Sequence, residues 1–162
     1  MNDSPLQRVR LSNPIHFLAL GFGSGLMRSA PGTWGSLVGL LLGWLLLQHL
    51  PSVFLAILTV LGFLIGCYLC QKTAEDMGVH DHGAIVWDEI IGIFIVLLFL
   101  PEYSFTWYVG AFLAFRFFDI LKPYPIRYFD HKLESGFGIM LDDVLAALYA
   151  ILTLVFLHYF LA

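Results

Sequence analysis

The stretch GSLVGLLLGWLLLQHLPSVFLAILTVLGFLIGCYLC, residues 35–70, decides the fold. It consists of two apolar runs, residues 35–50 and 53–70, joined at Pro51 and Ser52. Each run approaches the roughly 20 residues that a helix needs to cross about 30 Å of hydrocarbon. The stretch therefore predicts a hairpin of two membrane helices.

Three further apolar stretches continue the pattern toward the C-terminus: residues 84–100, 103–121 and 144–161. Pro101 ends the first of them and Pro123 follows closely on the second, as expected because proline interrupts a helix. Each stretch is a further candidate for a membrane helix.

The N-terminal residues 15–26 are also apolar, but three glycines interrupt them. This pattern suits a re-entrant or interfacial segment better than a full crossing. The sequence as a whole predicts an all-α integral membrane protein of about five hydrophobic helices, preceded by this glycine-rich segment. The start of the chain lacks a cleavable signal pattern, so we expect a cytoplasmic N-terminus.

Composition agrees with this fold class, since 59% of the 162 residues are hydrophobic and only 12% are charged. A water-soluble domain of this size cannot enclose so much apolar surface. No repeat or linker divides the chain, so we expect a single membrane-embedded domain over residues 1–162.

No run of like charges suggests nucleic-acid binding. Cys67 and Cys70 have no metal-ligating partner set and are expected to be free thiols.

Charge is distributed unevenly along the predicted topology. Five crossings from a cytoplasmic start place residues 1–34, 71–89 and 117–142 on one side of the membrane. All eight Lys and Arg residues lie on or next to that side, which the positive-inside rule assigns to the cytoplasm. Among the twelve acids, only Glu102 falls in a turn on the opposite side.

Five of the acids lie at the cytoplasmic ends of three predicted helices: Asp88, Glu89, Asp119, Asp142 and Asp143. Ionisable groups near hydrocarbon are functional-site candidates because they are costly to keep there. An oxygen-rich cluster of this kind suits Mg²⁺ or a similar hard cation. The alternative is helix capping, since acids favour helix N-termini, although a cap needs one acid rather than two adjacent pairs.

Two cations lie close to this cluster in the predicted topology. Arg116, Asp119 and Lys122 recur at a spacing of three residues and share roughly one helical face. Arg and Lys beside a metal site suit the binding of a phosphate. The alternative is a local ion pair between Arg116 and Asp119, with Lys122 reaching to the lipid headgroups.

Two other segments have weaker signals. The glycine-bearing residues 21–36, which include Gly32 and Thr33, offer backbone N–H groups to an anion, or glycines for close helix packing. His80 and His82 flank Asp81 and are either proton-transfer groups or ordinary loop residues.

Four blocks of the sequence together resemble the phosphatidylglycerophosphatase A family: GFGSGL with APGTWGS (within 21–36), HDHGAIVWDEIIG (80–92), FRFFDILKPYPI (115–126) and GFGIMLDD (136–143). The resemblance implies Mg²⁺-dependent hydrolysis of the terminal phosphomonoester of phosphatidylglycerophosphate, giving phosphatidylglycerol and inorganic phosphate in phospholipid biosynthesis. It also implies a multi-pass protein of the bacterial inner membrane with its active site on the cytoplasmic face.

The residues and the resemblance lead to one hypothesis about the site. The five carboxylates hold one or two Mg²⁺ ions and, with Lys122, form the catalytic set, while the phosphate is held by Arg116, Lys122, Gly32 and Thr33. Metal-activated water attacks the phosphomonoester. Two rival functions stay open: a phosphatase for another lipid phosphate such as a polyprenyl phosphate, and a small ion transporter.

Overall fold

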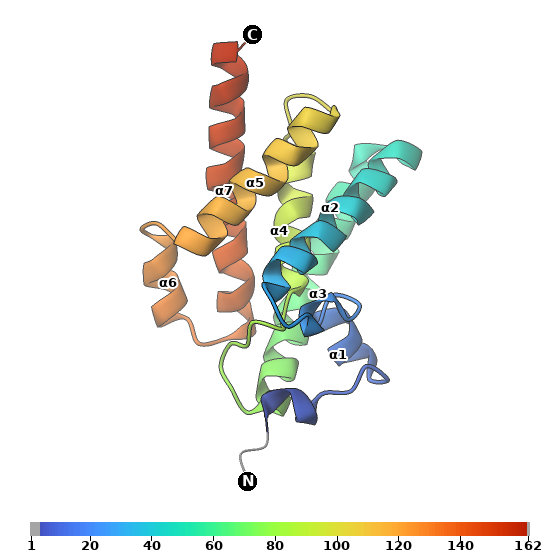
Figure 1. The fold of residues 1–162 in the computed structure, drawn as a ribbon, viewed down its shortest axis with the longest axis vertical. Helices are drawn as coiled ribbons and strands as arrows, with labels where there is room; N and C mark the ends of the chain where they lie inside the picture. The colour runs from blue at the N-terminus through green and yellow to red at the C-terminus, as the bar shows by residue number, and fades with distance from the viewer. Residues whose placement is uncertain (1–3, 162) are drawn as a thin grey trace.

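The computed structural model describes residues 4–161 and contains seven α-helices in that range (Figure 1). Two short 3₁₀ turns, η1 (Pro5–Arg8) and η2 (Ser24–Leu26), lie in the N-terminal segment. The helices are α1 (Pro14–Ala19), α2 (Pro31–His49), α3 (Ser52–Met77), α4 (Trp87–Leu98), α5 (Phe105–Leu121), α6 (Ile126–Lys132) and α7 (Gly136–Leu161).

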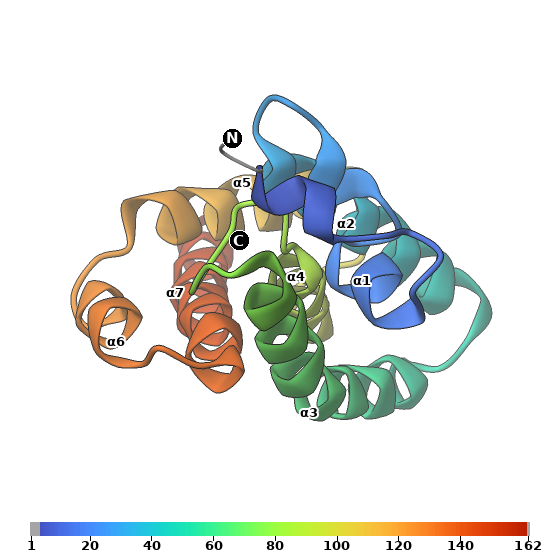
Figure 2. The ribbon, with the colours of Figure 1, turned by 90° about the horizontal axis from the view of Figure 1, so that it is seen from below.

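Helix α4 is the centre of the molecule, with α2, α3, α5 and α7 packed around it (Figure 2). Almost every residue of α4 is buried. Its 12 residues span about 18 Å, which is less than the thickness of a bilayer core. The predicted range 84–100 is therefore longer than the helix itself, and α4 is an internal core helix.

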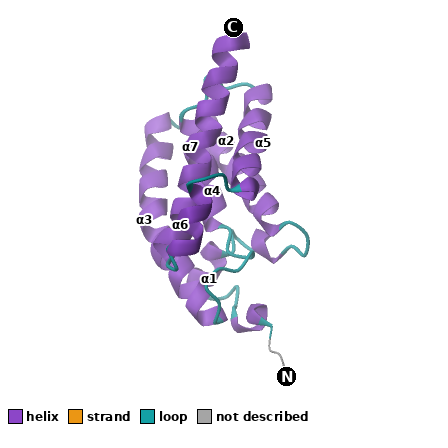
Figure 3. Ribbon diagram, turned by 90° about the vertical axis from the view of Figure 1, so that its left-hand side faces the viewer, coloured by secondary structure: helices purple, strands orange, loops and turns teal. Residues whose placement is uncertain are grey.

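The prediction of an all-α protein is confirmed, since residues 4–161 contain no strand (Figure 3). The five predicted apolar ranges correspond to α2, α3, α4, α5 and α7. Two of them, α3 and α7, are long and apolar enough to cross a membrane.

Large apolar side chains cover the outer faces of the long helices. Leu64 on α3, Ile120 on α5 and Leu152 on α7 are 62%, 66% and 68% exposed. Acidic side chains lie instead inside the bundle, where Asp88 and Asp143 are 9% and 3% exposed. Such an apolar surface over a partly polar interior suits contact with lipid rather than with water.

Glycines bring α2 directly against α4. A Cβ atom at Gly35 would lie 2.5 Å from Val86 Cβ, and one at Gly39 would lie 2.9 Å from the Cα atom of Ile90. Only a residue without a side chain permits this approach. The close packing places the N-terminus of α2 beside the first turn of α4.

The N-terminal segment doubles back instead of forming one helix. Helix α1 ends in a turn in which Gly21 and Gly23 have left-handed φ values of 57° and 94°, and η2 follows. The carbonyl of Ala19 accepts a hydrogen bond of 2.9 Å from the Val86 N–H. The segment thereby packs under the start of α4.

Two predicted helix boundaries are wrong by several residues. Helix α3 continues to Met77 and not only to residue 70, and α7 begins at Gly136, before the predicted residue 144. The two extensions pack on one another, because the Gly136 N–H donates to Gln71 Oε1 at 2.6 Å. An apolar run stops at the first charged residue, whereas a helix continues through charged residues that have partners.

The two ends of the bundle differ in character. The N-terminal segment and the loop before α4 lie at the lower end in Figure 1, helix α6 lies beside the lower half of α7, and the turns that follow α2 and α4 lie at the upper end. The segments predicted to share one membrane side therefore lie away from the end that contains the turns after α2 and α4.

Candidate active site

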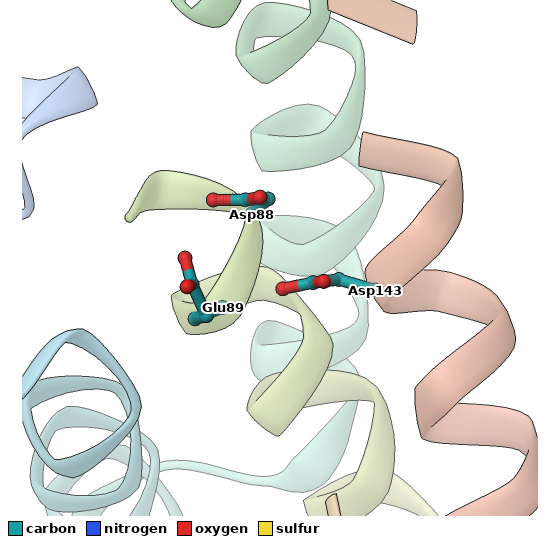
Figure 4. A group of neighbouring side chains, drawn as sticks. All are labelled: Asp88, Glu89 and Asp143. Carbon is teal, nitrogen blue, oxygen red and sulfur yellow. The ribbon is translucent and has the colours of Figure 1, made fainter. Parts of the chain in front are cut away.

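Three carboxylates from two helices meet inside the bundle. Asp88 and Glu89 belong to the first turn of α4, and the side chain of Asp143 extends toward them from α7 (Figure 4). One oxygen of each residue lies within 4.8 Å of the others. We call Asp88, Glu89 and Asp143 the carboxylate triad.

The triad is buried and short of hydrogen-bond donors. Asp88 Oδ1, Glu89 Oε2 and Asp143 Oδ2 have no hydrogen-bond partner among the residues that the structure describes. Buried carboxylates need a counter-charge or a bound cation, because the low local dielectric penalises an isolated charge. Oxygen ligands at this separation fit a hard divalent cation such as Mg²⁺.

Helix capping accounts for only part of the triad. Asp88 and Glu89 are in the first turn of α4, where the helix dipole favours an acid. Asp143 lies about two turns beyond Gly136, the first residue of α7, so the dipole of α7 does not explain its position. Capping alone is therefore excluded for the second acidic pair.

Helix α5 contributes an arginine and a further acid to the rim of the triad. Arg116 Nη1 pairs with Asp119 Oδ2 and lies 3.9 Å from Glu89 Oε1. The local ion pair that the sequence left as an alternative is thus present, and it also borders the triad. Asp119 lies beside Asp143. Arg116 Nε is buried without a partner in the described part of the chain.

Lys122 links three elements beyond the end of α5. Its Nζ donates to Asp130 Oδ1 at 2.9 Å and to Asp142 Oδ2 at 3.4 Å. Two of the five predicted ligands are the neighbours Asp142 and Asp143. Asp142 faces Lys122, whereas Asp143 extends toward Asp88 and Glu89. Lys122 therefore belongs to a half-buried network and does not reach out to the lipid headgroups, which was the alternative to a role at the site.

The network keeps Lys122 and Asp130 charged. Burial lowers the pKa of Lys122, but the hydrogen bond to Asp130 and the charge of Asp142 outweigh it and raise the pKa well above its usual range. Burial raises the pKa of Asp130, but hydrogen bonds with Asp142 and Lys122 outweigh it and hold the pKa below its usual value. The sequence did not single out Asp130 as a site residue. The only feature that marked it was its place in residues 117–142, which the predicted topology puts on the cytoplasmic side.

The N-terminus of α2 closes the site from the other side. A Cβ atom at Gly32 would lie 2.5 Å from Glu89 Oε1 and 3.1 Å from Arg116 Nη1. The Gly32 N–H belongs to the first turn of α2, where N–H groups lack an intrahelical acceptor. The Thr33 N–H instead donates to the Ala30 carbonyl at 2.9 Å. Of the two predicted phosphate-binding positions on α2, Gly32 and Thr33, the structure brings Gly32 against the triad.

The remaining sequence candidates have other surroundings. His82 Nδ1 accepts a hydrogen bond from the Ala84 N–H at 3.1 Å. His80 lines a separate hollow with Glu75 and Glu134. Cys67 and Cys70 are free, as predicted.

The family comparison and two relatives of this chain have the same name. The family model described as Phosphatidylglycerophosphatase A matches residues 17–158. A Haemophilus influenzae protein named phosphatidylglycerophosphatase A is 61% identical over 159 residues, 98% of each chain. An Escherichia coli K12 protein of the same name is 49% identical over 144 residues, 89% of this chain and 83% of that one.

The name of a third relative indicates a different activity. A Bacteroides thetaiotaomicron protein, provisionally named a phosphatidylinositol-3-phosphatase, is 38% identical over 139 residues, 82% of this chain and 86% of that one. No solved structure matches the chain.

Proposed function

Because the chain belongs to the phosphatidylglycerophosphatase A family and is a phosphoric monoester hydrolase, we propose that it hydrolyses phosphatidylglycerophosphate in a Mg²⁺-dependent step of phospholipid biosynthesis. The products are phosphatidylglycerol and inorganic phosphate. The observation that carries the proposal is the buried carboxylate triad with an arginine and a helix N-terminus at its rim.

The triad of Asp88, Glu89 and Asp143 would hold the Mg²⁺, with Asp119 beside Asp143. Asp142 pairs with Lys122 instead. When bound, the ion supplies positive charge to the phosphoryl oxygens and promotes ionisation of water. An oxygen-only ligand set is what Mg²⁺ prefers.

The remaining groups bind the phosphoryl group or hold the neighbouring acids in position. Arg116 holds Asp119 and faces Glu89, and its unpartnered Nε is a donor for a phosphoryl oxygen. Lys122 keeps Asp142 and Asp130 in place. The Gly32 N–H, at the positive end of the 19-residue helix α2, favours an anion at the same point. Donors fixed before the reaction stabilise developing charge without reorganisation.

We further propose that the protein is a multi-pass protein of the bacterial inner membrane with its site at the cytoplasmic surface. The exposed apolar faces of α3, α5 and α7 support immersion in lipid. The eight Lys and Arg residues on or next to the predicted site-bearing side support a cytoplasmic orientation. The diacylglycerol part of the substrate then stays in lipid while its headgroup enters the site.

A substrate panel tests this proposal. The purified chain in nonionic detergent is assayed for phosphate release from phosphatidylglycerophosphate, phosphatidic acid, a polyprenyl phosphate and phosphatidylinositol 3-phosphate, with Mg²⁺ and with a chelator. We expect phosphatidylglycerophosphate to be hydrolysed fastest, and only with Mg²⁺. Faster hydrolysis of the inositol lipid would assign the chain the activity named for the Bacteroides relative. Absence of phosphate release, combined with Mg²⁺ flux into proteoliposomes that contain the chain, would favour a transporter.

Gly32→Ala is expected to lower kcat/KM by roughly 10- to 100-fold, because a shift of about 1 Å in a catalytic group has effects of this size. The added methyl group would meet Glu89 Oε1 and the Arg116 guanidinium. Steady-state kinetics on phosphatidylglycerophosphate check this. Gly110→Ala is the matched control, since its Cβ would meet only the tip of Leu154 at 3.3 Å. Equal kcat/KM values for the two variants would contradict the prediction.

A further inference from the structure

A cationic cleft adjoins the site on the side of α6. It has a volume of about 700 Å³ and is lined by the segment after α5 and by one side of α6. We call it the α6 cleft, and the residues that matter here are Lys122, Tyr124, Arg127, Tyr128, His131 and Lys132.

The cleft has two cations that are not used by carboxylates. Arg127 Nη2 donates to the Leu121 carbonyl at 3.3 Å, and Lys132 Nζ donates to the Tyr128 hydroxyl at 2.7 Å. Among residues 4–161 neither has a carboxylate oxygen within 4.0 Å. No acid lines the cleft. Both side chains are exposed, so their charges remain available to an anion from the lipid surface.

Lys122 connects the cleft to the acidic pair of α7. This residue lines the cleft, and its Nζ also bonds Asp142, the neighbour of Asp143 in the chain. A ligand that occupies the cleft therefore lies next to the catalytic groups. Tyr124, which is 79% exposed, and Tyr128 lie at the mouth. Tyrosines of this kind favour the headgroup level of a membrane, where one end of the ring is apolar and the other wet.

The chemistry of the substrate calls for such a second anion site. Phosphatidylglycerophosphate has a terminal phosphomonoester and, one glycerol unit away, a phosphodiester that joins the headgroup to diacylglycerol. Under the proposed function, the triad, Arg116 and Gly32 bind the phosphomonoester, which leaves the phosphodiester without a binding group. A guanidinium offers a planar fork to two phosphate oxygens, and an ammonium adds a point charge.

We propose that the α6 cleft binds the phosphodiester of the lipid substrate, and that Arg127 and Lys132 thereby select lipids in which a phosphodiester precedes the phosphomonoester. This inference rests on the proposed function. It identifies two specificity-determining residues outside the carboxylate site.

The test compares Arg127→Gln, Lys132→Gln and the double variant with wild type in nonionic micelles that contain no other anionic lipid. For phosphatidylglycerophosphate we expect KM, as a mole fraction, to rise about fivefold in each single variant and at least tenfold in the double variant, with kcat within about twofold. For phosphatidic acid, which lacks the phosphodiester, kcat/KM should stay unchanged. Inhibition by phosphatidylglycerol, which has only the phosphodiester, should weaken in parallel with the rise in KM.

Arg10→Gln is the matched control, because it removes one exposed charge from the segment between η1 and α1, and Arg10 does not line the cleft. An equal rise in KM for Arg10→Gln would assign the effect to general surface charge and overturn the proposal. So would an unchanged KM in the double variant, or an equal loss on phosphatidic acid. A wild-type protein that releases no phosphate from phosphatidylglycerophosphate would refute the proposed function itself, which separates the two failures.

Discussion

Phosphate release by Glu89→Gln and by Asp143→Asn is expected to fall by roughly 10³-fold or more, because each change removes a charged ligand from a site built to stabilise charge. Each substitution keeps the size of the side chain. In each case the triad retains two acids. The loss is therefore expected in kcat at saturating Mg²⁺, and in Mg²⁺ affinity measured by titration calorimetry on the purified protein.

The control for this pair is Glu134→Gln, which removes an exposed acid outside the triad. It should keep both the wild-type rate and the wild-type Mg²⁺ affinity. Full Mg²⁺-dependent activity in Glu89→Gln and Asp143→Asn would refute the assignment of the triad. Wild-type Mg²⁺ affinity combined with lost activity would show instead that the acids act on substrate rather than on the metal.

Lys122→Met is expected to lower kcat/KM by roughly 10²- to 10³-fold, which is the usual effect of removing one charged or polar donor from a preorganised site. The variant leaves Asp130 and Asp142 facing one another without the shared ammonium group. Like charges at short range repel, so the midpoint of thermal unfolding should also fall by several degrees. Kinetics and a thermal melt in the same detergent measure the two effects.

A second substitution separates the two roles of Lys122. Adding Asp130→Asn to Lys122→Met removes one of the opposed charges, so the melting temperature should recover while kcat/KM stays low. Recovery of both quantities would mean that Lys122 acts only through folding. Lys122→Arg retains the charge, and we expect it to preserve stability better than activity, because the guanidinium fork has another shape.

Sequence patterns located five of the seven helices within residues 4–161, but not all of their ends. They missed α6, and α1 lies in the stretch predicted as a re-entrant or interfacial segment. The prediction stopped α3 at residue 70 and started α7 at residue 144, where charged residues interrupt the apolar runs. In the structure Lys72 pairs with Asp76 and Gln71 binds the Gly136 N–H, so the polar turns are stabilised by partners from their own or a neighbouring helix. An apolar pattern does not reveal such partners, because they are far apart in sequence or come together only once the helix has formed.

The candidate site was predicted in outline. Selecting acids at helix ends gave Asp88, Glu89 and Asp143, all of which meet in the triad. The same criterion also selected Asp142, which faces Lys122, and it missed Asp130, which shares that lysine. Adjacent residues on a helix point about 100° apart, so the rotation of the helix decides whether both acids of a pair reach one centre. Asp88 and Glu89 both do, whereas only Asp143 of the pair on α7 does.

The sequence by itself determined that the protein is helical, that its surface suits lipid, and that its acids gather at one end, because these properties follow from the number and order of apolar and charged residues. Only the tertiary structure decided that α4 is an internal helix and that Gly32 touches the triad. It also placed the cations of α6 beside the site. These features depend on how each helix is rotated and how closely it packs against its neighbours, and a one-dimensional pattern leaves both free.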